Sequence, residues 1–230
     1  MSSNAAPIHF AGSQFGDQRH VCAFFHSAEE KYRLLLPFIK DGFDCGNRAF
    51  HVVDPDRRKE HLQRLESAGI DTVPAESSGQ LKVCGWNEAH LDPAGHFDQH
   101  RMLALIEEEL KLGVTQGLGV SRAIGYMEWA LEDRPGVEDL VEYEARLNYI
   151  LPKYRDPVIC VYDIAKFSGD VIIDILRTHP MVIIGGTLQE NPFFVPPDAF
   201  LRELREKLVG QNQRGDAHAA YGSSAGTGRV

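Results

Sequence analysis

The sequence predicts an α/β protein: a three-layer, mostly parallel sheet with helices on both faces. Two observations lead to this class. Apolar, β-branched runs alternate with helical patterns along the chain, as they do in proteins built from βα units. The runs are apolar without alternation, which is typical of parallel strands buried on both sides. The stretch 157–197 shows both features most clearly, with strands expected at 157–162 and 181–184 around a short helix at 170–177.

Few polar residues interrupt this stretch. They are Cys160, Asp163, His179 and Asn191, and three of them lie at predicted strand or helix ends. Open α/β sheets bind their ligands in the crevice beyond the carboxyl ends of the strands. The sequence therefore places candidate functional residues in this part of the chain.

The predicted helices of the first half begin at recognisable capping residues. Ser27, with Glu30 three residues on, forms a capping box, and Asp54 precedes a proline that suits a first helical position. Pro37 inside the first helix predicts a kink. The expected elements are a strand at 20–25, a helix from 27 to the glycines at 42–46, a strand at 48–53, a helix at 55–67, and short strands at 70–73 and 80–84.

The helices of the second half are recognised by their apolar stripes. Met102, Ile106 and Leu110 lie on one side of the first of them. Glu144 falls within the apolar stripe of the next, and a carboxylate on a buried helix face needs a partner or a raised pKa. The expected elements are helices at 97–112, 137–151, 170–177 and 198–208, and strands at 120–127, 157–162 and 181–184.

The composition indicates a globular protein without a nucleic-acid surface. The 230 residues suffice for one sizeable α/β domain or two small ones, and the net charge of −9 disfavours nucleic acid, which needs a basic face. No run reaches the roughly 18 apolar residues of a membrane span, and no signal peptide is visible. Four cysteines without paired spacing suit buried thiols in a cytoplasmic protein.

We expect residues 1–18 and 210–230 to be disordered and residues 19–209 to form the domain.

Seven short motifs occur in an order that is typical of one protein family. They are HVCAFF at 20–25, the glycines at 42–46, GYMEW at 125–129, YE at 143–144, CVYD at 160–163, HP at 179–180 and NPFFVPP at 191–197. Over residues 18–208 the chain resembles the MEDS sensory domain, named from methanogen and methylotroph proteins and a dichloromethane-responsive repressor. The resemblance implies a sensor of a small organic molecule, proposed to be a hydrocarbon derivative, and distant kinship with RecA-like ATPases of the circadian-clock type.

Two departures from the family pattern matter. Members are often fused to a DNA-binding, kinase-like or anti-sigma domain, whereas here only a flexible tail is expected to follow. The resemblance then implies a partner in trans, namely a kinase, an anti-sigma factor or a transcription factor, and it leaves a homo-oligomer open. A RecA-like ATPase also needs G-x-x-x-x-G-K-[ST] after its first strand, but residues 26–30 read HSAEE. We therefore expect a degenerate RecA-like fold without a P-loop and without ATP hydrolysis.

We expect polar anchors in an otherwise apolar pocket, the usual composition of a small-molecule site. Glu128 follows a strand directly, Glu144 lies on an apolar helix face, and Arg122 inside a strand is the obvious counter-ion for one of them. The competing interpretation is a buried structural ion pair between Arg122 and Glu144. The candidate ligand-binding residues are His20, Cys22, His26, Arg122, Glu128, Trp129, Tyr143, Glu144, Tyr162, Asp163, His179 and Asn191.

A second hypothesis concerns a metal. His20 and Cys22 are two residues apart on a strand and so share a face, while Cys160 lies on another inner strand and His179 precedes a proline. Two nitrogens and two sulfurs suit zinc or a similar ion, although the spacing matches no compact zinc finger. The alternative is that the cysteines pack as small apolar groups and the histidines bond to the backbone.

Three functions follow from these interpretations. The favoured one is a non-enzymatic, cytoplasmic sensor of a small organic effector, because the sequence shows no nucleophile–base arrangement. The second is a metal- or haem-dependent sensor or enzyme that uses the histidines and cysteines. The third is a nucleotide-binding switch without hydrolysis.

Overall fold

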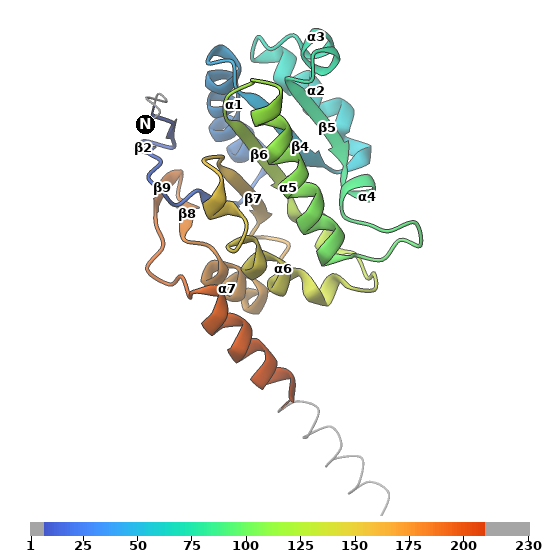
Figure 1. Cartoon of the computed structure of the whole chain (residues 1–230), viewed down its shortest axis with the longest axis vertical. Coiled ribbons are helices and arrows are strands. Elements are labelled where there is room, and N and C mark those ends of the chain that lie inside the picture. The colour runs from blue at the N-terminus through green and yellow to red at the C-terminus, as the bar shows by residue number, and fades with distance from the viewer. Residues whose placement is uncertain (1–6, 210–230) are drawn as a thin grey trace, which may run out of the picture.

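A seven-stranded sheet forms the centre of the protein (Figure 1). The computed structural model describes residues 7–209. The strand order is β5-β4-β6-β7-β3-β8-β9, and every pairing is parallel except that of β9 with β8. The strands are β3 His20–Phe25, β4 Arg48–Val53, β5 Leu81–Gly85, β6 Ser121–Tyr126, β7 Val158–Asp163, β8 Met181–Ile184 and β9 Thr187–Glu190. The expectation of a mostly parallel sheet is confirmed.

Helices cover both faces of this sheet, which confirms the three layers. One face carries α1 Ala28–Asp44, α2 Arg58–Ser67 and α3 Thr72–Ser77, and the other carries α5 Gln99–Thr115, α6 Leu140–Leu147 and α7 Gly169–Thr178. In Figure 1, α5 and α6 lie in front of the sheet and α1 lies behind it. The remaining helical segments are α4 Trp86–Ala89, the 3-10 turns Pro55–Arg57, Met127–Leu131, Val137–Asp139 and Leu151–Lys153, and a helix at 197–209.

The strands have two buried faces because their side chains alternate between two separate apolar clusters. On β3, Val21, Ala23 and Phe25 pack toward α1, whereas Cys22 and Phe24 pack toward the opposite layer. This explains why the strand sequences show no polar positions in alternation. Strand β3 lies between β7 and β8, so that His20 is opposite Val158 of β7 and the next residue, Val21, is opposite Met181 of β8.

The predicted start of the first helix is confirmed in detail. The Ser27 hydroxyl accepts a hydrogen bond from the Glu30 amide at 3.2 Å, and the Glu30 carboxylate accepts one from the His26 amide at 2.9 Å. Pro37 lies inside α1, as expected. The Asp54 side chain likewise accepts a hydrogen bond from the Asp56 amide at 2.9 Å.

Two predicted elements are wrong. Residues 70–73 do not form a strand, because the chain turns into α3 at Thr72, and Pro74 suits the first turn of a helix. The helix expected at 137–151 is regular only over α6. It ends at Asn148, whose side-chain amide donates to the Glu144 and Ala145 carbonyls at 3.2 Å each and so takes the partners of the next turn.

Two further features were not expected from the sequence. Residues 7–18, predicted to be loose, include the strands β1 His9–Phe10 and β2 Ser13–Gln14, and the Phe10 ring packs 4.3 Å from the Phe38 ring. Strand β9 forms because Gly185 and Gly186 both have positive φ, which suits a tight hairpin after β8. The predicted disorder of residues 1–6 and 210–230 lies outside the described residues.

Within residues 7–209, no helix combines the length and the apolar character that crossing a membrane would require.

Candidate functional site

A pocket of about 110 Å³ lies at the carboxyl ends of the parallel strands. We call it the carboxyl-edge pocket. It receives side chains from the first turns of α1, from α2, and from the segments that follow β4, β6 and β7. An adjoining recess of about 60 Å³ adds Ser27, Ala28 and Asp163. The pocket is lined by Lys31, Tyr32, Val53, Asp54, Arg57, His61, Tyr126, Glu128 and Lys166.

The charges around this pocket are balanced. The buried Lys31 ammonium lies 3.7 Å from a Glu128 carboxylate oxygen and 4.4 Å from the centre of the Tyr126 ring. Burial lowers the pKa of Lys31, and the Glu128 charge acts in the opposite direction. Lys166 lies 3.4 Å from Asp163 and 4.0 Å from Glu128. The pocket and its recess therefore hold three cations and three carboxylates. The cations are Lys31, Arg57 and Lys166, and the carboxylates are those of Asp54, Glu128 and Asp163.

The inner wall of the pocket is polar but uncharged. The Tyr32 hydroxyl lies 3.0 Å from His61 Nδ1, and His61 Nε2 lies 2.9 Å from His51 Nδ1. Burial lowers the pKa of His51 to about 3 and also lowers that of His61, so both rings stay neutral. Tyr126 is buried, and its hydroxyl has no hydrogen-bond partner among residues 7–209.

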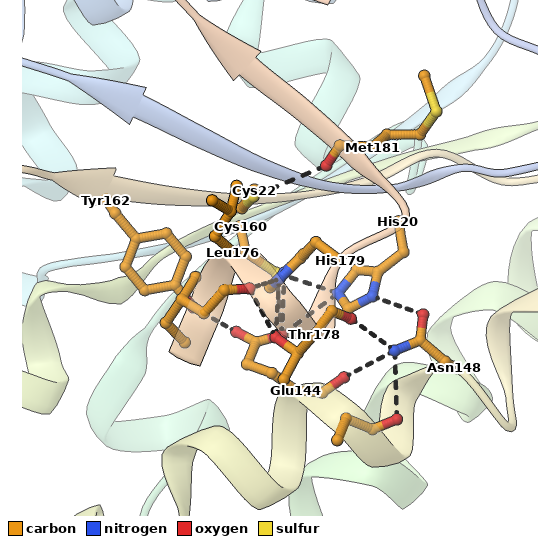
Figure 2. Close-up of polar contacts among 12 residues, drawn as sticks. His20, Cys22, Glu144, Asn148, Cys160, Tyr162, Leu176, Thr178, His179 and Met181 are labelled. Atoms are coloured by element: carbon orange, nitrogen blue, oxygen red, sulfur yellow. Dashed lines mark hydrogen bonds and ion pairs between the residues drawn. The ribbon is translucent and has the colours of Figure 1, made fainter. Parts of the chain in front are cut away.

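A second group of polar residues lies inside the protein, and we call it the buried cluster (Figure 2). It comprises His20 from β3, Glu144 from α6, Cys160 from β7 and His179 directly after α7. One ligand atom from each of the four lies within 4.8 Å of all the others. Glu144 and His179 have no exposed surface, and His20 and Cys160 have at most 4%.

Glu144 is the centre of this cluster. Its Oε2 atom lies 3.2 Å from His20 Nε2, 3.3 Å from His179 Nε2 and 3.5 Å from Cys160 Sγ. Its Oε1 atom accepts a hydrogen bond of 2.6 Å from the Tyr162 hydroxyl. Burial acts to raise the pKa of Glu144, but the neighbouring His179 and His20 outweigh burial and leave that pKa below its ordinary value. Burial also lowers the pKa of His20 to about 4.

The structure separates Arg122 from Glu144, so the predicted ion pair between them is wrong. The Arg122 guanidinium donates to the Phe38 carbonyl at 2.5 Å and to an Asp41 carboxylate oxygen at 2.7 Å. Both partners belong to α1, whereas Glu144 is on α6 on the opposite face of the sheet. The alternation of side chains on β6 directs Arg122 away from the layer that holds Glu144.

Three of the four predicted metal ligands come together, and Cys22 does not join them. Its sulfur is directed toward the Met181 carbonyl oxygen at 3.7 Å. Glu144 from α6 occupies the place between His20 and Cys160 instead. Cys160 does not simply pack as an apolar group, because its sulfur lies 3.7 Å from His20 Nε2.

The other predicted ligand-binding residues are distributed over the molecule. Trp129 packs in the core with its ring 4.5 Å from Phe97, and Tyr143 meets the same ring edge-on at 5.7 Å. Asn191 donates to the carbonyl of His179 at 2.7 Å and so fixes the backbone next to the buried cluster. His26 is exposed. Of the predicted set, only Glu128 lines the carboxyl-edge pocket itself, and Tyr162 and Asp163 line the adjoining recess.

Sequence reasoning did not assign six charged or polar residues to the pocket, namely Lys31, Tyr32, Asp54, Arg57, His61 and Lys166. One signal was available for Lys31 and Tyr32: the first turn of a helix that follows a parallel strand lies near the carboxyl edge of the sheet. No local pattern distinguishes Arg57, His61 or Lys166 from ordinary surface residues.

The fold and the pocket define a class of protein: an open, mostly parallel α/β protein with a polar pocket beyond the carboxyl ends of its strands. The chain belongs to the MEDS family, whose model is described as the methanogen/methylotroph, DcmR sensory domain and matches residues 19–180. The family resemblance seen in the sequence is thereby confirmed.

Two known proteins are similar to this chain. The chain is 29% identical over 178 residues to the transcriptional repressor DcmR of Methylorubrum extorquens (strain DSM 6343 / CIP 106787 / DM4), covering 76% of this chain. It spans 63% of the length of that repressor. The uncharacterised protein PH0321 of Pyrococcus horikoshii, crystallised with an unknown peptide, matches with a TM-score of 0.53 and 15% identity over 72% of this chain and 76% of its own. This second likeness concerns the fold alone.

Proposed function

We propose that this chain is the non-catalytic sensor of a signalling system and that the carboxyl-edge pocket binds its effector, a small, neutral organic molecule. The observation that carries the proposal is the pocket itself, with its balanced charges and the unpartnered Tyr126 hydroxyl on its wall. Membership of a sensory-domain family supports it.

The size of the pocket limits the effector. Its volume of about 110 Å³ is smaller than the roughly 150 Å³ of an apolar cavity that holds benzene. Drug-sized ligands need roughly 300–1,000 Å³. The effector therefore has about six non-hydrogen atoms or fewer, a size that suits simple hydrocarbon derivatives.

The charges of the pocket favour a neutral effector. Lys31, Lys166 and Arg57 face the same number of carboxylates, so neither an anion nor a cation gains a net attraction. We propose that the effector reaches the buried Tyr126 hydroxyl in the pocket wall, which can donate to an oxygen or halogen. The ring faces of Tyr32 and Tyr126 supply apolar contact area.

A nucleotide switch is disfavoured by the start of α1. In many α/β proteins, the free amides at this position bind phosphate. Here the Glu30 amide already donates to Ser27 and the His26 amide to the Glu30 carboxylate. The first turn also carries two carboxylates, Glu29 and Glu30, which repel an anion.

The signal is proposed to pass to a regulatory protein in the cytoplasm, such as a kinase, an anti-sigma factor or a transcription factor. The likeness to a transcriptional repressor supports an output in transcription. The distant kinship with RecA-like ATPases belongs to the same proposal, and the chain has no P-loop between β3 and α1 that would support hydrolysis.

The Tyr126→Phe substitution tests the proposed pocket, because it removes only the unpartnered hydroxyl. Binding of short alcohols, amides, haloalkanes, carboxylates and alkylammonium ions is measured by ligand-observed NMR. We expect a neutral member of this panel to bind, and its affinity to fall about 5- to 10-fold in the variant, since one hydrogen bond contributes roughly 1 kcal/mol.

Tyr149→Phe is the matched control. It removes a hydroxyl that is bonded to Asp198 on the surface, and it is expected to leave binding unchanged. Equal affinities in the wild type and Tyr126→Phe, or binding by charged members only, would contradict the proposed site.

A further inference from the structure

The hydrogen bonds around His20 determine which of its ring nitrogens carries the proton. The Asn148 side-chain amide donates to the carbonyls of Glu144, Ala145 and Thr178 at 3.2, 3.2 and 2.8 Å. Three carbonyl acceptors fix the amide orientation, so Asn148 Oδ1 is the atom that faces His20 Nδ1 at 3.1 Å. An amide oxygen only accepts. Neutral His20 therefore has its proton on Nδ1 and a lone pair on Nε2.

The same reasoning applies to His179. Its Nδ1 lies 2.8 Å from the Ile175 carbonyl oxygen, which only accepts, and 3.0 Å from the Thr178 hydroxyl. The Thr178 hydroxyl itself donates to the Ile175 carbonyl, so its oxygen is free to accept from His179. His179 Nδ1 is thus the donor, and Nε2 keeps its lone pair. In the described part of the chain, this Nε2 has no hydrogen-bond partner.

Both nitrogens lie next to the carboxylate of Glu144. Its Oε2 atom, also a lone-pair donor, lies 3.2 and 3.3 Å from the two nitrogens. A single proton can bridge one histidine to this oxygen, which leaves the other nitrogen without a strong donor; the Cys160 thiol, a weak donor, lies 3.7 Å from His20 Nε2. A second proton leaves a net positive charge in a fully buried site, which is costly. One metal ion satisfies all of these atoms at once.

Four of the six separations in the buried cluster are close to those of a tetrahedral site. Zinc lies about 2.0–2.3 Å from nitrogen, oxygen and sulfur ligands, which places tetrahedral ligands roughly 3.3–3.7 Å apart. The four separations given above for His20, Glu144, Cys160 and His179 are 3.2, 3.3, 3.5 and 3.7 Å, and the two that join His179 to His20 and to Cys160 are within 4.8 Å. Both histidines also donate their second N–H to an oxygen, as zinc-binding histidines do.

We propose that His20 Nε2, His179 Nε2, Glu144 Oε2 and Cys160 Sγ bind one divalent ion of the zinc type. The carboxylate and a thiolate together neutralise the ion, so the buried site carries no net charge. With four protein ligands the site is closed, which is typical of a structural ion. It ties α6 and the end of α7 to β3 and β7, and it does not depend on the effector proposed for the carboxyl-edge pocket.

Cobalt is the probe for this site. The full chain is treated with a chelator, dialysed, and titrated with Co²⁺. We expect one cobalt per chain, visible d–d absorption of tetrahedral strength, a near-ultraviolet thiolate-to-cobalt band, and displacement by Zn²⁺. A wild-type chain that takes up neither ion at one equivalent, measured by elemental mass spectrometry, overturns the proposal.

Two cysteine variants test the identity of the sulfur ligand. Cys160→Ser is expected to lose the thiolate-to-cobalt band, and Cys22→Ser is the matched control. Cys22 is equally buried and lies opposite Cys160 in the neighbouring strand, but its thiol is directed to Met181. Loss of the band in Cys22→Ser with retention in Cys160→Ser overturns the assignment.

X-ray absorption of the wild-type zinc protein covers the case in which Cys160→Ser does not fold. One sulfur and three nitrogen or oxygen ligands are expected. A spectrum with two sulfurs, or with none, contradicts the proposed ligand set.

Discussion

At the residue scale, two buried arginines differ in the exposure of their partners. Arg48 is 2% exposed and its guanidinium lies 2.5 Å from Glu109, whose side chain is only 5% exposed. Arg122 is as deeply buried, but its partner Asp41 has a side chain that is 54% exposed. A charge that loses its partner inside the protein stays unpaired, whereas a charge near solvent can be compensated by water.

Substitution of the two carboxylates should therefore have unequal effects. Glu109→Gln leaves Arg48 as an uncompensated buried charge and is expected to reduce the free energy of unfolding by about 3–5 kcal/mol. Asp41→Asn is expected to reduce it by less than about 1 kcal/mol, because Asp41 is exposed and water can replace its carboxylate beside Arg122. Urea denaturation measures both, and similar losses would show that partner exposure does not control the cost.

At the scale of elements, α5 and β6 approach each other at a glycine. A Cβ atom built on Gly113 would lie 2.2 Å from the Ser121 hydroxyl oxygen and 3.9 Å from Arg48 Cδ. Glycine inside a helix costs roughly 1 kcal/mol relative to alanine. The close contact with β6 explains why α5 has glycine at this position.

Gly113→Ala is accordingly expected to destabilise the protein by about 1–3 kcal/mol, through overpacking against Ser121, despite its better helix propensity. The double variant Gly113→Ala, Ser121→Ala should recover most of this loss, because it removes the oxygen that clashes. Thermal unfolding of the two single variants and the double variant measures the coupling. A stabilised Gly113→Ala protein would mean that Ser121 rotates away at little cost.

At the scale of the whole molecule, histidines that are buried in neutral form control the response to acid. Burial lowers the pKa of His51 and of His90 to about 3, and it also lowers the pKa of His61. The unfolded chain therefore binds protons near pH 6.5 that the folded chain does not, and stability falls as the pH falls. Asp156 acts in the opposite direction, because burial raises its pKa to about 6.

We expect the free energy of unfolding to decrease between pH 6.5 and pH 4. Each buried histidine contributes up to about 1.4 kcal/mol per pH unit, and Asp156 offsets roughly one such contribution. Urea midpoints across this range measure the slope. His90→Phe should flatten the slope, whereas His26→Gln, a change at an exposed residue, should leave it unchanged. A slope that is the same in all three proteins would contradict the assignment to buried histidines.

Most of the fold could be predicted from the sequence because its signals are local. Continuous apolar runs gave the central strands, and Ser27 and Asp54 marked helix starts through contacts with residues two or three positions away. The N-terminal strands were missed because they depend on a contact with Phe38, which is distant in the sequence. The errors at 70–73 and at β9 had local causes, Pro74 in the first turn of α3 and the glycine pair 185–186 in the hairpin.

The sequence by itself determined the type and order of the main elements, the absence of a P-loop between β3 and α1, and the family motifs. Only the tertiary structure decided which side chains meet. Arg122 and Glu144 are both buried, as expected, yet they lie on opposite faces of the sheet. His20 and His179 are far apart in the sequence, and they meet because β3 lies between β7 and β8. The pattern of residues along the chain determines local helices and strands. The order of the strands and the face on which each side chain lies determine which distant residues become neighbours, and both candidate sites are made of such neighbours.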